Sequence, residues 1–413
     1  MRRLAERAVF RSLEKIRGGR LTLSLPDGRE RTFGEPGTDL DAVVEVRDAS
    51  LFPRFLFGGD IAFGETYAEG LWSSPDLSAV TRLGARNARV FDAGSRLPAL
   101  LARVIERVRH RLRRNSVRGS RANIRFHYDL GESFYALFLD PSLTYSCAIF
   151  DPPGLSLEEA QREKLDRIAR RLALSPGDRL LEIGTGWGAF AIHAARHYGC
   201  RVTTTTISAA QLEFVRRRLD QEGLAGRVTL LREDYRRLRG RFDKAVSIEM
   251  FEAVGLAYYD HFFGAVDRLL EPGGTMLLQT IWMNEARYAR YRRQPDFIQR
   301  HVFPGSELAS IAEIRRSLAR ATRMAVAGVE QIGPHYVTTL AAWRARFREN
   351  ADRVRALGFP ESFVRMWDYY LAYCEGGFAE RYIGDAQMLL ARAGTPCPES
   401  VDAAGSGVAE VRS

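Results

Sequence analysis

A single cysteine stands within a dense aromatic segment, FHYDLGESFYALFLDPSLTYSCAIF, at residues 126–150. Seven aromatic side chains surround Cys147 in this segment, interleaved with acidic residues and with the hydroxyls of Ser142 and Thr144. A cysteine in this setting can act as a nucleophile, fill the core as a small apolar side chain, or hold a ligand. No histidine is placed so as to indicate a Cys–His pair, and the segment by itself leaves the three roles open.

A glycine-rich loop follows a predicted strand in LLEIGTGWGAF, residues 180–190. Gly184, Gly186 and Gly188 let the backbone turn sharply and let a ligand press against it. The spacing E-x-G-x-G-x-G differs from the G-x-G-x-x-G of dinucleotide-binding enzymes. Glu182 can hold a cationic amino group, and Asp234, after the third strand of this region, can accept a hydrogen bond from an adenine amine. This set predicts a site for S-adenosylmethionine.

The strand after the glycine loop departs from the usual methyltransferase pattern. It ends in TTTTIS, residues 203–208, and carries no acidic residue to bind the ribose hydroxyls. Thr206, Ser208 and Gln211 are the polar residues that can take this role.

Helix and strand patterns alternate from residue 155 onward, and this alternation predicts a mainly parallel sheet with helices on both faces. Residues 306–393 read as mostly helical with one closing strand, AQMLLARA. The expected fold class is therefore α/β, with a small α+β domain at the N-terminus. The expected organisation is an N-terminal domain at 1–90, a basic amphipathic linker helix at 91–120, a catalytic domain at 121–394 and a disordered tail at 395–413.

Composition narrows the class of protein. The 413 residues carry a net charge of +10, and no stretch reaches the roughly 18 uninterrupted apolar residues of a membrane span. The N-terminus shows no apolar run and no small-residue cleavage site, so no secretory signal is expected. The four cysteines lie far apart without a CxxC pair, which argues against a disulfide framework and against a zinc site. We expect a cytoplasmic protein with free thiols. The excess of basic over acidic residues favours anionic partners, and no nucleic-acid-binding motif stands out in the sequence.

Leucine, isoleucine and valine recur at helical spacing between Leu97 and Leu112, opposite a face rich in arginine. A basic amphipathic helix of this kind can lie in a membrane interface. A linker between domains with a solvated arginine face explains the same pattern.

Several ordered motifs carry a resemblance to a known family. HYDLGESFYALFLDPSLTYSCAIF is followed by LEIGTGWG, SIEMFEAVG, LLEPGG, FIQRHVFPGSEL, PHYVTTLAAW and MWDYYLAYCEGGF. Over residues 120–393 the chain resembles the cyclopropane-fatty-acid synthase and mycolic acid methyltransferase family, and FGETYAEGLW resembles the N-terminal extension of its longer bacterial members. The resemblance implies a Rossmann-like class I methyltransferase fold with a seven-stranded sheet.

The resemblance also implies a reaction, the transfer of the methyl carbon of S-adenosylmethionine to a cis double bond of an acyl chain. A bound bicarbonate is the implied base, held by Cys147, Glu252, Gln279, the backbone of Ile281, and Tyr336. Cys147 would then be an anion ligand and not a nucleophile. The residues expected to hold the cofactor are Tyr145, Ser146, Glu182, Gly184, Gly186, Trp187, Gly188, Thr206, Ser208, Gln211, Asp234 and Tyr235. The reaction passes through a cation on the chain, which aromatic faces stabilise, so Tyr128, Phe134 and Tyr135 are expected to line the substrate channel.

Two residues depart from the family's pattern. Gln279 stands where family synthases carry a histidine that holds bicarbonate, and Ala253 stands where they commonly carry another histidine. Glutamine can hydrogen-bond an anion but cannot take up a proton. Proton release elsewhere would give a methylene or methyl branch in place of a ring.

The sequence therefore favours a peripheral enzyme of the inner membrane surface that cyclopropanates unsaturated phospholipid acyl chains. Its partners would be an anionic membrane and those chains, with no nucleic acid; a homodimer is one option for its oligomeric state. An enzyme that methylates a small soluble molecule, and a lipid-binding protein without catalysis, are the two rival hypotheses.

Overall fold

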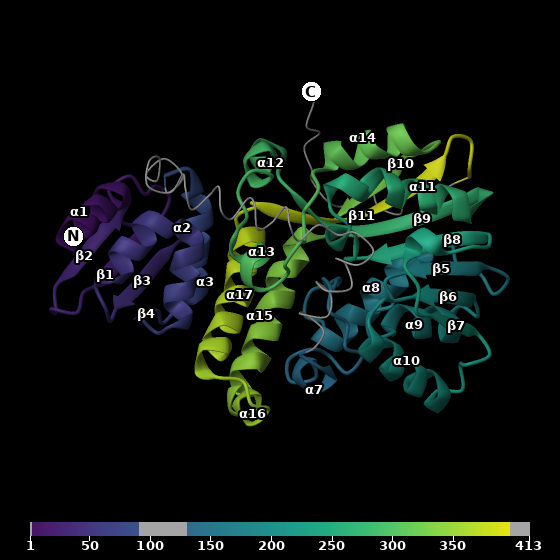
Figure 1. The fold of residues 1–413 in the computed structure, drawn as a ribbon, viewed down its shortest axis with the longest axis horizontal. Helices are drawn as coiled ribbons and strands as arrows, with labels where there is room; N and C mark the ends of the chain where they lie inside the picture. Colours follow the sequence, from purple (N-terminus) through teal and green to yellow (C-terminus); the bar gives the residue numbers. More distant parts are fainter. Residues whose placement is uncertain (1, 91–129, 397–413) are drawn as a thin grey trace.

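The computed structural model describes residues 2–90 and 130–396, which form two sheets with their helices (Figure 1). The basic segment at 91–120, Tyr128 and the tail beyond residue 396 lie outside the described residues. None of the described helices combines the length and the apolar character needed to cross a membrane.

The N-terminal unit is a four-stranded sheet covered by three helices. Its strand order is β2-β1-β3-β4, with β1 and β3 parallel and the other pairs antiparallel. Alternate residues of β1 and β3, such as Leu21, Leu23 and Val44, are buried, because successive side chains of a strand point to opposite faces. The elements are α1 (Arg2–Leu13), β1 (Arg20–Ser24), β2 (Glu30–Gly34), β3 (Asp41–Val46), α2 (Leu51–Ala68), β4 (Trp72–Ser73) and α3 (Leu77–Arg86).

The larger sheet has seven strands in the order β10-β11-β9-β8-β5-β6-β7, which confirms the predicted α/β fold. The run from β9 to β7 is parallel, and β11 and β10 are antiparallel additions at one edge. The strands are β5 (Arg179–Ile183), β6 (Arg201–Thr205), β7 (Val228–Leu231), β8 (Phe242–Ile248), β9 (Leu270–Met283), β10 (Met324–Gln331) and β11 (Ile383–Arg392).

Helices lie on both faces of this sheet (Figure 1). They are α7 (Glu132–Tyr135), α8 (Leu157–Arg171), α9 (Ala189–His197), α10 (Ala209–Gln221), α11 (Tyr259–Leu269), α12 (Glu285–Tyr291), α13 (Phe297–His301), α14 (Ile311–Ala321), α15 (Gly333–Glu349), α16 (Ala351–Ala356) and α17 (Glu361–Ala379). Short 3-10 turns span Tyr235–Arg237, Phe251–Ala253 and Leu256–Tyr258.

The edge strand β10 corrects the expectation that residues 306–393 are helical apart from one closing strand. Its sequence MAVAGVEQ alternates between inward and outward side chains, but only Met324 is fully buried. Alanine and glycine at the alternating positions weaken the period-two pattern by which a strand is identified.

The helix α17 joins the two units. Tyr67 on α2 donates to Asp368 on α17 at 3.0 Å, and Thr81 on α3 donates to the Ala372 carbonyl at 2.7 Å. A Cβ on Gly376 would lie 2.7 Å from the Thr81 side chain, so α3 and α17 approach at a point where only glycine fits. One apolar core therefore continues from the N-terminal sheet into the helices beside the seven-stranded sheet.

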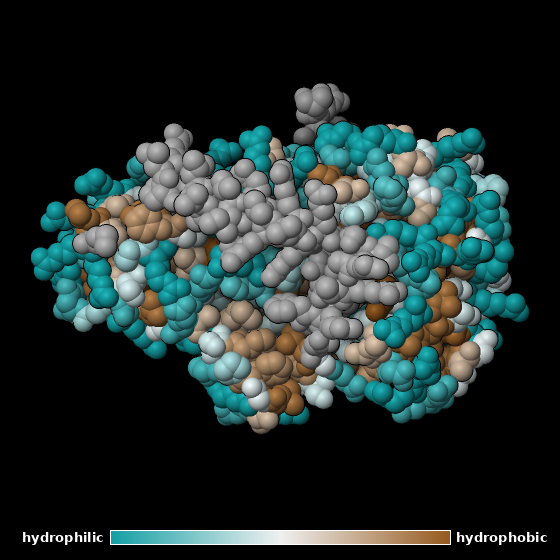
Figure 2. Space-filling view, in the orientation of Figure 1, coloured by the Kyte–Doolittle hydropathy of each residue, from teal (hydrophilic) through white to brown (hydrophobic). Residues whose placement is uncertain are grey.

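The surface is mostly hydrophilic in the view of Figure 2, and apolar side chains gather at the α16 end of the α15–α17 pair. Leu357, directly after α16, is 47% exposed and is one of few large apolar residues exposed to this degree among those described.

Candidate active site

The glycine loop leads from β5 into α9 at the carboxyl edge of the sheet. Gly184, Gly186 and Gly188 have φ values of 103°, 53° and 87°, in the left-handed region that favours glycine. Gly188 is the N-cap of α9, so the loop presents a helix N-terminus to the space above it. A Cβ on Gly184 would lie 2.9 Å from Met250, which shows how tightly this turn packs.

Glu182 lies just before the loop and is 2% exposed. Its carboxyl group accepts a hydrogen bond of 2.6 Å from Thr204, which in turn contacts Thr185 at 2.7 Å. Burial raises the pKa of Glu182 to about 8. A cationic amino group bound here would favour the charged carboxylate, which suits the role expected for this residue.

The polar residues after β6 form a small network at the start of α10. Thr206 donates to Gln211 Oε1 at 2.7 Å, and Ser208 caps α10 by accepting from the Gln211 N–H. Within the described part of the chain, the buried Nε2 of Gln211 has no hydrogen-bond partner. A buried donor in this state costs free energy unless a ligand accepts from it, so Gln211 fits a ligand oxygen such as a ribose hydroxyl.

Asp234 and Tyr235 follow β7 and complete this edge. The Asp234 carboxylate binds Arg236 at 2.6 Å, and although burial opposes its charge, the hydrogen bonds from Arg236 hold the pKa of Asp234 below its ordinary value. Asp234 therefore stays an acceptor at neutral pH. Together the loop, Glu182, Gln211 and Asp234 fit S-adenosylmethionine.

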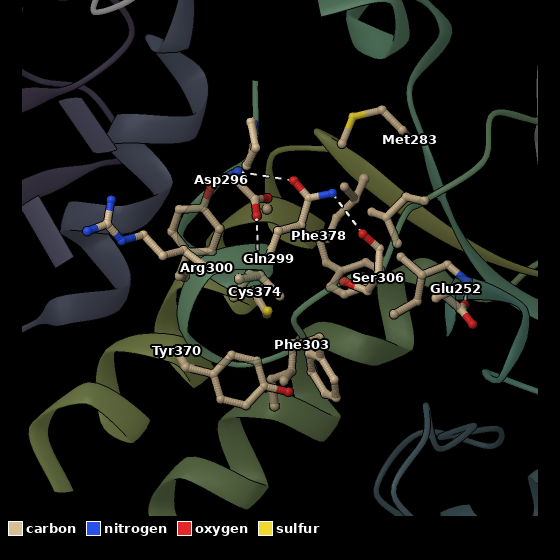
Figure 3. A pocket seen from close by; sticks show the side chains of 18 of the residues that line it. Glu252, Met283, Asp296, Gln299, Arg300, Phe303, Ser306, Tyr370, Cys374 and Phe378 are labelled. Atoms are coloured by element: carbon tan, nitrogen blue, oxygen red, sulfur yellow. Dashed lines mark hydrogen bonds between the residues drawn. The ribbon is translucent and has the colours of Figure 1, made fainter. Parts of the chain in front are cut away.

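A cavity of about 970 Å³ begins at this loop and extends to the N-terminal unit. Figure 3 shows its middle part, where Phe303, Tyr370, Cys374 and Phe378 form a mainly apolar wall with Glu252 at one end. Beyond this wall, residues of the N-terminal sheet and of α2 continue the lining, among them Leu21, Val44, Phe52 and Phe55. The cavity thus joins a polar cofactor end to a long apolar passage.

A carboxylate that the sequence did not single out lies at the reacting end of the cavity. Glu249 follows β8 directly and accepts hydrogen bonds from the Cys147 N–H at 2.9 Å, Gln279 Nε2 at 2.8 Å and the Tyr336 hydroxyl at 2.7 Å. Gln279 is itself oriented by Gln387, whose amide donates to Gln279 Oε1 at 3.1 Å.

Glu252 lies beside Glu249 and also lines the cavity. Its Oε1 accepts from the Ile281 N–H and, at 2.9 Å, from the Thr280 hydroxyl. Among the described residues its buried Oε2 has no hydrogen-bond partner. Burial, assisted by the charge of Glu249, raises the pKa of Glu252 to about 8. One oxygen is therefore fixed by the backbone and the other is available to a bound molecule.

The Cys147 thiol points away from this centre. It is fully buried, and its Sγ donates to the carbonyls of Ala148 at 3.3 Å and Ile332 at 3.6 Å. Burial raises the pKa of the thiol well above its ordinary value, so it stays neutral and cannot act as a nucleophile. Cys147 was expected to hold an anion. In the structure its backbone N–H, and not its sulfur, donates to an anionic group, the Glu249 carboxylate.

The predicted aromatic residues separate into two groups. Tyr145 lines the cavity and shares a hydrogen bond of 2.8 Å with the Tyr370 hydroxyl. Phe134 and Tyr135 are fully buried and are not among the described residues that line the cavity. Phe134 packs against Trp367 at 4.9 Å between ring centroids, so it supports the wall from the core side instead of forming it.

Ser146 and Trp187 also line the cavity. Ser146 accepts a hydrogen bond of 2.7 Å from Lys164, a fully buried lysine that sequence reasoning overlooked. Burial lowers the pKa of Lys164, and Glu249 is among the groups that favour its charged form. Asp385 on β11 was overlooked as well; burial, the charge of Glu249 and a hydrogen bond to Glu249 raise its pKa well above the ordinary value.

The donors expected to hold bicarbonate are already paired with side chains of the protein. Three of them bind Glu249, and the Ile281 N–H binds Glu252. A free anion at this position would face carboxyl groups and would lack its donors. The residues present do not fit a bicarbonate ion here.

Comparisons with known proteins identify the family of the chain. The family described as "Mycolic acid cyclopropane synthetase" matches residues 115–388. The chain is 36% identical over 357 residues to the cyclopropane-fatty-acyl-phospholipid synthase of Escherichia coli, with 85% of this chain and 88% of the relative covered. It is 37% identical, over 85% of this chain and 83% of the relative, to the tuberculostearic acid methyltransferase UfaA1 of Mycobacterium tuberculosis.

Among solved structures, the mycolic acid cyclopropane synthase CmaA1 complexed with SAH and CTAB superposes with a TM-score of 0.62 at 33% identity. The superposition covers 66% of this chain and 98% of the CmaA1 chain. The family expected from the ordered motifs is thereby confirmed. The chain belongs to the mycolic acid cyclopropane synthetase family and is an S-adenosylmethionine-dependent methyltransferase of the cyclopropane-synthase type.

Proposed function

We propose that this enzyme transfers the methyl carbon of S-adenosylmethionine to a cis double bond of a phospholipid acyl chain and closes a cyclopropane ring. The continuity of the cavity carries the proposal, because the glycine loop opens directly into a long apolar passage. Small-molecule sites enclose roughly 300–1,000 Å³. The volume of about 970 Å³ therefore leaves room for a cofactor and an acyl chain side by side.

The residues of the chain supply positioning and a dry environment. When bound, S-adenosylmethionine supplies an electrophilic methyl group. The glycine loop and Gln211 orient it, while Tyr145, Phe303 and Tyr370 present aromatic surface along the passage. Each aromatic face can stabilise a nearby cation by about 0.5–2 kcal/mol without attacking it. Exclusion of water protects the cationic chain from hydrolysis.

The identity of the base is a separate part of the proposal. The bicarbonate expected from the family does not fit donors that already bind Glu249 and Glu252, so the proposed reaction includes no step through bicarbonate.

We also propose that the enzyme works peripherally at the cytoplasmic, anionic surface of the inner membrane, where its substrate chains are anchored. The net charge of +10 supports this location, since a basic residue near an anionic leaflet contributes about 1 kcal/mol.

A second candidate product is an acyl chain with a methylene or methyl branch. The 37% identity to a relative named tuberculostearic acid methyltransferase favours it. Gln279, which cannot take up a proton, also leaves the route of proton release open.

The substrate class is tested by mixing the purified protein and S-adenosylmethionine with vesicles of phosphatidylglycerol. We expect S-adenosylhomocysteine to form with cis-monounsaturated chains and not with saturated chains of equal length, because only the π bond accepts the methyl group. Equal turnover on both kinds of vesicle, or turnover on neither, would contradict the proposal.

A further inference from the structure

The structure assigns the role of base in this reaction to Glu249, a carboxylate of the chain itself that takes the place expected for bicarbonate. This inference rests on the proposed function, since it names the group that removes the proton in that reaction. It departs from the expectation of a free anion, and neither Cys147 nor Glu252 fills the role.

The position of Glu249 is the first support. Three donors from three separate segments converge on its carboxylate, namely the Cys147 N–H, Gln279 and Tyr336. Those donors were the expected ligands of bicarbonate, which is itself a carboxylate-like anion. Glu249 satisfies them with a side chain, and it lines the cavity at the reacting end.

The backbone gives a second support. Glu249 has a φ of 47°, and its N–H donates to the Gln279 carbonyl at 2.8 Å. A residue other than glycine is strained in the left-handed region, because its Cβ lies close to the backbone. Backbone strain of this kind concentrates at functional sites, where the surrounding structure holds it in place.

The groups around Glu249 give a third support. Its two acidic neighbours, Glu252 and Asp385, both have a raised pKa, chiefly through burial, and therefore hold their protons more tightly. The ammonium group of Lys164 is buried nearby and interacts with Glu249. Of the three carboxyl groups in this cluster, Glu249 is the one that accepts hydrogen bonds from Cys147, Gln279 and Tyr336, and this position at the reacting end of the cavity assigns it the role of proton acceptor.

The step balances without a further reagent. The π pair of the alkene forms a bond to the methyl carbon, and the carbon–sulfur bond breaks with its pair left on sulfur, which yields neutral S-adenosylhomocysteine. The positive charge now lies on the acyl chain. A C–H bond of the new substituent then breaks, its electron pair closes the ring, and the proton passes to the Glu249 carboxylate.

Chemical rescue tests the assignment. Glycine at position 249 suits the φ of 47° and opens space for a small anion, whereas glutamine keeps the shape without the basicity. We expect the wild-type rate to be unaffected by removing or adding bicarbonate. Glu249→Gln should lose roughly 100-fold or more in turnover. Glu249→Gly should lose as much, and should recover about 10-fold or more with acetate, formate or bicarbonate.

The outcomes distinguish a catalytic role of Glu249 as the base from a purely structural role. Binding of S-adenosylhomocysteine checks that each variant folds. A wild-type rate that falls when bicarbonate is removed would overturn the inference. A Glu249→Gly variant that keeps its rate without an added anion would also overturn it, and so would a Glu249→Gly variant whose rate no added anion restores. Full activity of Glu249→Gln would overturn it as well.

A binding readout keeps this test independent of turnover. Carbon-13 NMR of labelled bicarbonate should show line broadening with Glu249→Gly and none with the wild type. Bicarbonate binding to the wild type would overturn the assignment of Glu249, whereas a wild type that excludes bicarbonate yet modifies no acyl chain would contradict only the proposed function.

Discussion

Replacing Glu252 with glutamine is expected to lower turnover on unsaturated vesicles about 100- to 1,000-fold while cofactor affinity stays nearly unchanged. Oε1 of Glu252 is held by the Ile281 N–H and Thr280, and a glutamine oxygen can accept the same bonds. Glu252 lines the cavity, and its buried Oε2 has no hydrogen-bond partner among the described residues. Burial raises the pKa of Glu252 to about 8, and a cation on the acyl chain beside it would favour the ionised carboxylate; glutamine keeps the volume but cannot ionise to stabilise that cation.

The measurement is kcat from S-adenosylhomocysteine formation, together with calorimetric titration of the cofactor. Glu307→Gln is the matched control, because the Glu307 N–H donates to the Glu252 carbonyl at 2.8 Å, while its carboxylate accepts from the Leu256 N–H and is not part of the cavity lining. This control should keep its rate. A large loss of cofactor affinity in Glu252→Gln would show that Glu252 serves the cofactor instead of the reacting chain.

Replacing Gly184 with alanine is expected to weaken binding of S-adenosylmethionine roughly 10- to 100-fold. The φ of 103° at Gly184 is strained for alanine, and the new Cβ would lie 2.9 Å from Met250. The loop must shift to accept it, and a cost of about 1–3 kcal/mol corresponds to that loss of affinity.

Calorimetric titration measures the effect. Gly223→Ala is the control, because Gly223 has a φ of 69° but no atom within 4 Å of the new Cβ, and it lies at the far end of α10. This control should lose some stability and keep its cofactor affinity. Unchanged affinity in Gly184→Ala would remove this glycine from the cofactor site.

The arrangement of the candidate cofactor site could largely be predicted because its signals are local. Glu182 and the glycines form one short segment between a strand and a helix, so their spacing fixes their arrangement. Gln211 lies within the first turn of the next helix and was found in the same way.

The centre around Glu249 could not be predicted in this way, because its role arises from residues far apart in the chain. Its donors Cys147, Gln279 and Tyr336 lie 102, 30 and 87 positions away. A carboxylate directly after the central strand β8 was the available signal. The direction of the Cys147 thiol depends on packing against Ile332, which no local pattern encodes.

The central claim is that one cavity brings the methyl group to an acyl double bond and then removes a proton from the product. Methyl-deuterated S-adenosylmethionine, supplied with cis-monounsaturated phosphatidylglycerol vesicles, tests it by mass spectrometry and proton NMR of the released chains. We expect the released chains to carry two of the three methyl deuterons and to show cyclopropane protons without an olefin. A labelled chain that keeps an olefin would support the branched product, and bound cofactor without any label in the lipid would contradict the account.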